Sequence, residues 1–172
     1  MPDLTEFEFD LVFALPAEVP EEDELLDALF VAGCDDAAVG AGVAGLLGLA
    51  FNRSGEDAET VISGAVEQAL SALPDGSELR EVKPDLVSLA DVAARLQVSR
   101  QALQKREMPP PSLGGLYRAA EMVRYLDAQP GKVRQGLVTA RGWFAAAPAA
   151  QRINARLSLE PRKKGGKEFL AI

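Results

Sequence analysis

The chain has 172 residues, of which 48% are hydrophobic and 26% are charged, as in an ordinary folded globular protein. It contains one cysteine and no histidine, which excludes an internal disulfide, histidine-based catalysis and histidine metal ligands. The formal net charge is −8, but the charges are divided unevenly along the chain. Residues 1–84 carry 19 acidic and 3 basic side chains, whereas residues 85–172 carry 7 acidic and 15 basic ones. Only the second half therefore favours a polyanionic partner.

The acidic half predicts a small α+β domain. Apolar and polar residues alternate over residues 7–13, which predicts a half-buried strand. Carboxylates after Pro20 open a helix that stops at Gly33. The remaining predicted elements are a strand at 37–39, a strand at 45–51, a helix at 57–73 and a strand at 78–83. The resulting order, βαββαβ, is that of a ferredoxin-like sandwich.

A glycine-rich segment in this half matches the spacing of a dinucleotide-binding fingerprint. Gly40, Gly42 and Gly45 occupy the positions of G-x-G-x-x-G, which binds a pyrophosphate only where it follows a strand and opens a helix. The residues that follow contain another glycine and end in a turn predicted at residues 52–55. We therefore interpret the segment as a tight turn in a small sheet and expect no cofactor.

The start of the basic half predicts two short helices joined by a tight turn. Ser88 and Asp91 have the spacing of a capping box, which opens a helix over residues 89–96. Ser99 is a second N-cap, and the helix that it opens spans residues 100–106. Arginine, glutamine and lysine remain on the outward side of this second helix, and these residue types bind base edges in the major groove.

This segment resembles a helix-turn-helix DNA-binding unit, and the residues after it narrow the resemblance to the excisionase-like branch of the MerR-type winged helix-turn-helix superfamily. In that pattern the second helix is followed by a proline-containing turn, a glycine-containing two-stranded wing and a helix with an acidic residue in its first turn. Here those parts are residues 108–111, 113–118 and 119–126. One departure is Gln97, because many such units have a left-handed glycine there.

The resemblance implies a DNA-binding surface on the second helix and the wing. The residues assigned to it are Ser99, Arg100, Gln101, Gln104, Lys105, Arg106, Tyr117 and Arg118. The helix would enter the major groove, and the wing would contact the adjacent backbone or minor groove. Two alternatives stay open: the two helices form an ordinary helical hairpin, and Tyr117 is a core aromatic residue of the wing.

The end of the chain is predicted to be a basic extension. Trp143 and Phe144 form an apolar pair that packs on either domain or forms a dimer contact, and a helix is expected over residues 149–159. Residues 161–167 are expected to be a flexible basic arm, which follows a phosphate backbone or acts as a solubilising tail.

The predicted chain therefore has three parts: an acidic α+β domain (1–84), a winged helix-turn-helix domain (85–128) and a basic C-terminal extension (129–172). We expect a sequence-specific regulator of transcription that binds double-stranded DNA, namely a prokaryotic or phage repressor. It would act as a homodimer, with its acidic domain pointing away from the DNA. The alternative is an antitoxin-like or phage-control protein whose acidic domain binds a partner protein. An enzyme is not expected, since histidine, a second cysteine and a positioned carboxylate pair are all missing.

The sequence also predicts a soluble, cytoplasmic protein with no membrane partner. The first ten residues are acidic and lack the basic segment that opens a signal peptide. The longest apolar stretch, at residues 37–51, contains four glycines and falls short of the ~18 residues that span a bilayer.

Overall fold

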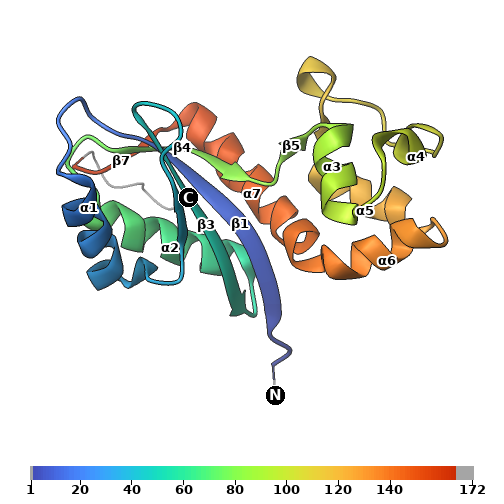
Figure 1. Ribbon diagram of the computed structural model, residues 1–172, viewed down its shortest axis with the longest axis horizontal. Coiled ribbons are helices and arrows are strands. Elements are labelled where there is room, and N and C mark those ends of the chain that lie inside the picture. Colours follow the sequence, from blue (N-terminus) through green and yellow to red (C-terminus); the bar gives the residue numbers. More distant parts are fainter. Residues whose placement is uncertain (1, 166–172) are drawn as a thin grey trace.

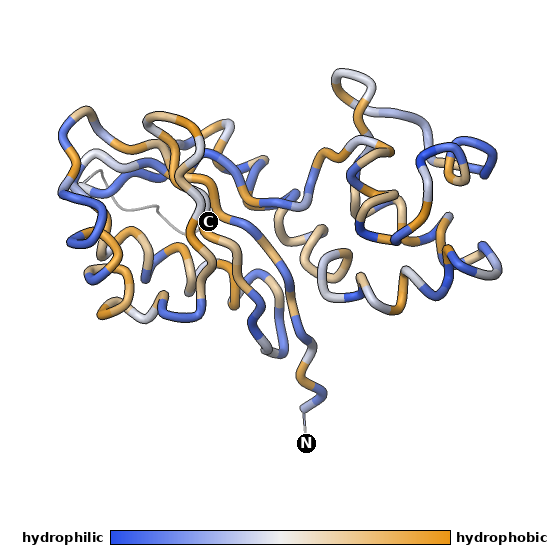
Figure 2. Tube along the Cα trace, in the orientation of Figure 1, coloured by the Kyte–Doolittle hydropathy of each residue, from blue (hydrophilic) through white to orange (hydrophobic). Residues whose placement is uncertain are grey.

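Alternating side chains place β1 (Thr5–Ala14) at the centre of a five-stranded sheet in the computed structural model, which describes residues 2–165 (Figure 1). Every second residue of β1 from Phe7 to Phe13 is buried, and Figure 2 shows this alternation along the strand. The strand order is β2-β3-β1-β4-β7, and each pairing is antiparallel. The other strands are β2 (Ala38–Gly40), β3 (Leu46–Gly55), β4 (Glu78–Lys83) and β7 (Arg162–Lys163). The predicted α+β class is confirmed.

Three helices bury the apolar face of this sheet: α1 (Glu22–Leu29), α2 (Ala58–Ala72) and the C-terminal half of α7 (Arg141–Leu159). After α1 one wider helical turn, Phe30–Cys34, ends where Gly33 takes a φ of 100°. Helix α2 begins as predicted, because the Asp57 side chain accepts a hydrogen bond from the Thr60 N–H. We call the sheet and these helices the sheet lobe.

A second core lies in a helical lobe, formed by residues 85–140 and the first turns of α7. Its largest fully buried side chains are Leu96, Leu103, Met122 and Leu126. The elements are β5 (Leu86–Val87), α3 (Leu89–Leu96), α4 (Arg100–Gln104), β6 (Tyr117–Arg118), α5 (Ala119–Asp127) and α6 (Lys132–Thr139).

Helix α7 belongs to both cores and joins the two lobes (Figure 1). Trp143 and Phe144 pack in the helical lobe, whereas Ala150 and Ile153 pack against the sheet. The sequence predicts a helix that starts only at residue 149, but α7 starts at Arg141 and continues through Pro148. Residues of α7 on both sides of Pro148 are buried, and the free energy of this burial is larger than the cost of the backbone hydrogen bond that the proline removes.

The predicted turn at residues 52–55 is wrong, because β3 continues through these residues. Asn52 pairs with Glu8 and Ser54 pairs with Glu6. Pairing with the long strand β1 therefore keeps these residues of β3 in the sheet. The glycine-rich segment before β3 connects one strand to another and opens no helix. This arrangement agrees with the interpretation of that segment as a turn.

The two-stranded wing predicted over residues 113–118 does not form within that segment. Leu113–Gly115 is a short helical turn in which Gly114 and Gly115 have φ angles of 63° and 74°. The prolines before it have no N–H to give to a strand ladder. β6 pairs instead with β5, which lies just before α3, so the small sheet joins residues about 30 apart in the sequence.

The basic segment 161–167 is not a free arm over its described part. Arg162 and Lys163 form β7 and pair with Leu79 and Glu78 of β4. The Lys164 ammonium donates hydrogen bonds to the backbone carbonyls of Ser71 and Leu73. The last two residues of the segment lie outside the described residues.

Candidate nucleic-acid interface

The predicted pair of short helices is present, with both predicted caps. The Ser88 Oγ accepts a hydrogen bond from the Asp91 N–H at 3.1 Å, and the Asp91 carboxylate accepts one from the Ser88 N–H at 2.9 Å. Gln97 ends α3 in the left-handed conformation, with a φ of 57°, which a residue other than glycine rarely adopts. The Ser99 Oγ then accepts the Ala102 N–H at 3.1 Å and opens α4.

Helix α4 turns one side inward and leaves the other side free. Leu103 is fully buried in the core of the helical lobe. The outward side chains are Arg100, Gln101, Gln104 and Lys105, which are all exposed and make no hydrogen bond or ion pair with residues 2–165. Figure 2 shows that α4 and the turn after it form a hydrophilic stretch at the end of the helical lobe.

The other predicted contact residues are engaged inside the protein. Arg106 donates a hydrogen bond to the Gln129 side chain at 3.0 Å and fastens the end of α4 to the end of α5. Tyr117 is half-buried against the core of the helical lobe, so the structure agrees with its interpretation as a core aromatic residue. Arg118 pairs with Asp85 at 2.8 Å, and its side chain is only 22% exposed.

Asp85 makes buried side-chain contacts at the junction of the two lobes. Its second carboxylate oxygen accepts a hydrogen bond from Asn154 at 3.0 Å, and Asn154 also binds both backbone groups of Val82. The Asp85 side chain is 7% exposed. Asp85 therefore links the end of the small β5–β6 sheet to α7 at the junction of the lobes, and no local sequence signal marks such a distant contact.

A hollow of about 440 Å³ lies beside α4. It is lined by Ser88, Leu89, Arg100, Gln104, Arg106, Met108, Gly115 and Tyr117. Four of the predicted contact residues thus come together around one concave surface. Ser99, Gln101, Lys105 and Arg118 are not among its lining residues.

The positive charge of the second half is divided between two roles. Five of its cationic side chains form ion pairs with the acidic half, so they are not available to a polyanionic partner. These pairs are Arg95–Glu8, Arg152–Glu59, Arg156–Glu59, Arg162–Glu67 and Lys163–Glu78. The hydrogen bonds of Arg156 and Arg152 lower the pKa of the Glu59 carboxyl below its ordinary value.

The cations that remain without an ion pair gather on the helical lobe. Within residues 85–165 they are Arg100, Lys105, Arg106, Arg124, Lys132, Arg134 and Arg141, besides Lys164 on its backbone carbonyls. The available positive surface is therefore smaller than the sequence suggests, and it surrounds α4, α5 and α6.

Residues 2–165 hold no cluster of three or more cysteine, aspartate or glutamate side chains with the geometry of a metal site. In the same range, no helix combines the length and the apolar character that crossing a membrane demands. Comparison of the chain with protein-family models, with curated proteins and with solved structures finds no match.

Proposed function

We propose that the protein is a sequence-specific regulator that binds double-stranded DNA through α4. The observation that carries this proposal is the set of four exposed, unengaged side chains on that helix and its C-cap: Arg100, Gln101, Gln104 and Lys105. Arginine binds the O6 and N7 atoms of guanine, and glutamine binds N6 and N7 of adenine in the major groove. Lysine beside them supplies a contact to the phosphate backbone.

The position of α4 supports the same proposal. In Figure 1 this helix lies at the end of the helical lobe that is farthest from the sheet lobe. A duplex on α4 would therefore meet Arg100 and Lys105 and stay away from the acidic residues of the sheet. The hollow between α4 and the residues after it gives room for the edge of a groove.

The fold supports a finer interpretation of both lobes. The order βαββαβ over residues 5–83, with antiparallel pairing throughout, favours a ferredoxin-like sheet lobe. The capped helices α3 and α4, the β5–β6 pair and α5 favour a winged helix-turn-helix whose wing is reduced to one short pair of strands. Since one five-residue reading helix contacts few base pairs, the chain would bind as a homodimer.

Selection of bound sites from a pool of random duplexes by the full chain tests this proposal. We expect an enriched site with two half-sites separated by about 10 base pairs or a multiple of that spacing. Affinity for this site should fall steeply between 50 and 200 mM salt, because each phosphate contact releases counterions. A pool that stays random after several rounds would overturn the proposal.

A matched pair of variants separates DNA contact from net charge. Lys105→Ala should reduce the slope of log affinity against log salt by about one on every duplex. Arg152→Ala removes the same charge from α7, where the side chain is bound to Glu59, and should leave the slope unchanged. Equal effects of the two variants would show that α4 is not the contact surface.

A further inference from the structure

The five-stranded sheet has an open edge at β2 (Ala38–Gly40), its outermost strand beyond β3. All three residues of β2 are exposed. Among residues 2–165, the backbone groups of residues 38–42 form no hydrogen bond besides those that pair β2 with β3. The N–H and C=O groups on the outer side of β2 are therefore available to a further strand.

This edge lacks the features by which proteins usually protect a sheet edge, namely charged side chains, proline and a β-bulge. Residues 37–51 contain no charged residue and no proline, although residues 1–84 carry 19 acidic side chains. The pairing of β2 with β3 contains no bulge. Val39 in β2 is 40% exposed, and Val43 in the turn after it is 62% exposed. An uncharged, exposed edge in an otherwise acidic lobe is typical of a surface that pairs with another strand.

The sequence around β2 fits a second copy of the same chain. Two β2 strands that meet antiparallel about Val39 place this valine opposite Val39 of the copy. Continued in the same register, the pairing places Asp35 and Asp36 opposite the uncharged residues 43 and 42 of the copy. Because no two carboxylates then face each other, like-charge repulsion between opposite residues is absent along this edge. A two-fold axis through Val39 makes the contact self-complementary, as in most homodimers.

We propose that two copies of the chain join through their β2 strands and form one continuous sheet. This inference deepens the proposed function by naming the surface of the homodimer, and its requirement for a second copy rests on that function. Helix α7 packs on β1 and β4, which are separated from β2 by β3. The helical lobes therefore stay clear of this contact, and α4 of each copy remains free for DNA (Figure 1).

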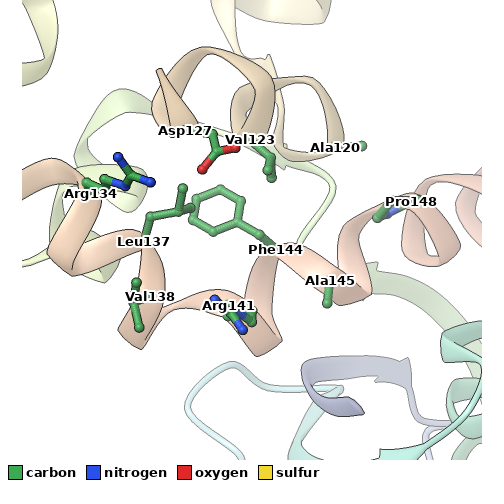
Figure 3. A pocket seen from close by; sticks show the side chains of 10 residues that line it. All are labelled: Ala120, Val123, Asp127, Arg134, Leu137, Val138, Arg141, Phe144, Ala145 and Pro148. Carbon is green, nitrogen blue, oxygen red and sulfur yellow. The ribbon is translucent and has the colours of Figure 1, made fainter. Parts of the chain in front are cut away.

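Sedimentation velocity of the full chain without DNA tests the contact, at about 0.15 M salt to screen repulsion between the acidic lobes. Because the paired edge is short, we expect a monomer–dimer equilibrium with a dissociation constant of about 1–100 μM. Val39→Lys should weaken the dimer about fivefold or more, since the two-fold axis places the new charges directly opposite each other. Val138→Lys makes the same change at an exposed valine of α6 (Figure 3) and should leave the dimer unchanged.

A disulfide between the two copies tests the register. Residues directly opposite each other in an antiparallel pair have Cα atoms about 4.5–5.5 Å apart, a separation that a disulfide spans. Under mild oxidation Val39→Cys should form a covalent dimer about tenfold or more faster than Val43→Cys, which this register places opposite residue 35 of the copy. The native Cys34 is buried in both variants, so it leaves the comparison unaffected.

Three results would overturn the inference. The first is a chain that stays monomeric up to about 500 μM, and the second is a dimer that Val39→Lys does not weaken. The third is cross-linking of Val43→Cys as fast as that of Val39→Cys, which remains decisive even if the lysine variant does not fold. An enriched site in the duplex selection, found together with any of these results, would exclude this surface and leave the proposed DNA binding standing.

Discussion

Replacing Gly136 by alanine should destabilise the protein, because α6 meets the backbone of α3 at this glycine. A Cβ atom built on Gly136 would lie 2.2 Å from the carbonyl oxygen of Leu96 and 2.8 Å from its Cα. Real Cβ atoms essentially never come within 3.0 Å of another heavy atom in this way. The atoms that it meets belong to the backbone, so no side chain can turn away, and α6 and α3 must separate.

The size of the effect follows from two opposing contributions. Overpacking of a rigid contact costs about 1–3 kcal/mol of folding free energy. The new Cβ meets the backbone of Leu96, which cannot move aside alone, so we expect a cost at the upper end, about 3 kcal/mol. Alanine is about 1 kcal/mol more favourable than glycine inside a helix. The free energy of unfolding should therefore fall by about 2 kcal/mol.

Gly64→Ala is the matched control. Gly64 also lies inside a helix, α2, but it is exposed and a Cβ there would meet nothing within 4 Å. This variant should gain most of the helix preference, about 0.5–1 kcal/mol. Urea unfolding followed by circular dichroism measures both free energies at 25 °C. The account of the α3–α6 contact would be refuted if Gly136→Ala were as stable as the unmodified chain.

Three further predictions concern single contacts. Gln97→Gly should raise the free energy of unfolding by about 0.5–1 kcal/mol in urea, since glycine adopts the φ of 57° without strain; no gain would contradict this. Asp85→Ala leaves Arg118 without its buried partner and should cost about 3 kcal/mol in the same assay, whereas a cost below about 1 kcal/mol would argue against a structural pair. The two hydrogen bonds from Arg53 lower the pKa of the Asp36 carboxyl below its ordinary value of 3.8. The ion pair therefore stabilises the folded protein fully above pH 3.8, and this stabilisation is lost as the pH falls through the lower pKa of the folded state. Asp36→Asn should destabilise the protein more at pH 6 than at pH 2, and a pH-independent effect would exclude this ion pair.

Features set by neighbouring residues could be predicted from the sequence. The alternation around Phe9 gave the central strand, and the Ser88–Asp91 spacing gave the capping box at the start of α3. Ser99 likewise marked the start of α4. Each of these signals acts within a few residues, where backbone geometry and side-chain chemistry decide the structure with little influence from the rest of the fold.

Features set by distant residues could not be predicted. Arg118 looks like a free cation in the sequence, but Asp85, 33 residues earlier, binds it. The charge split at Pro84 suggested two separate surfaces, whereas α7 returns to the sheet and places two of its arginines on Glu59. Local sequence patterns do not indicate which distant surfaces contact each other, so the extent of the unpaired positive surface could be determined only from the fold.

The interpretation of α4 as the reading helix predicts which of its side chains carry specificity. Arg100 and Gln104 both line the hollow beside α4, and both are free of other partners within residues 2–165. Each bidentate contact with a base contributes about 1–3 kcal/mol of discrimination. Their loss should therefore reduce the preference for the correct sequence more than it reduces binding to DNA in general.

The most direct test is the ratio of dissociation constants for the selected duplex and a scrambled duplex, measured by fluorescence anisotropy at one salt concentration. In the double variant Arg100→Ala, Gln104→Ala this ratio should fall by about tenfold or more, with little change in binding to the scrambled duplex. An unchanged ratio in a folded double variant would contradict the assignment of α4 as the element that reads the DNA sequence.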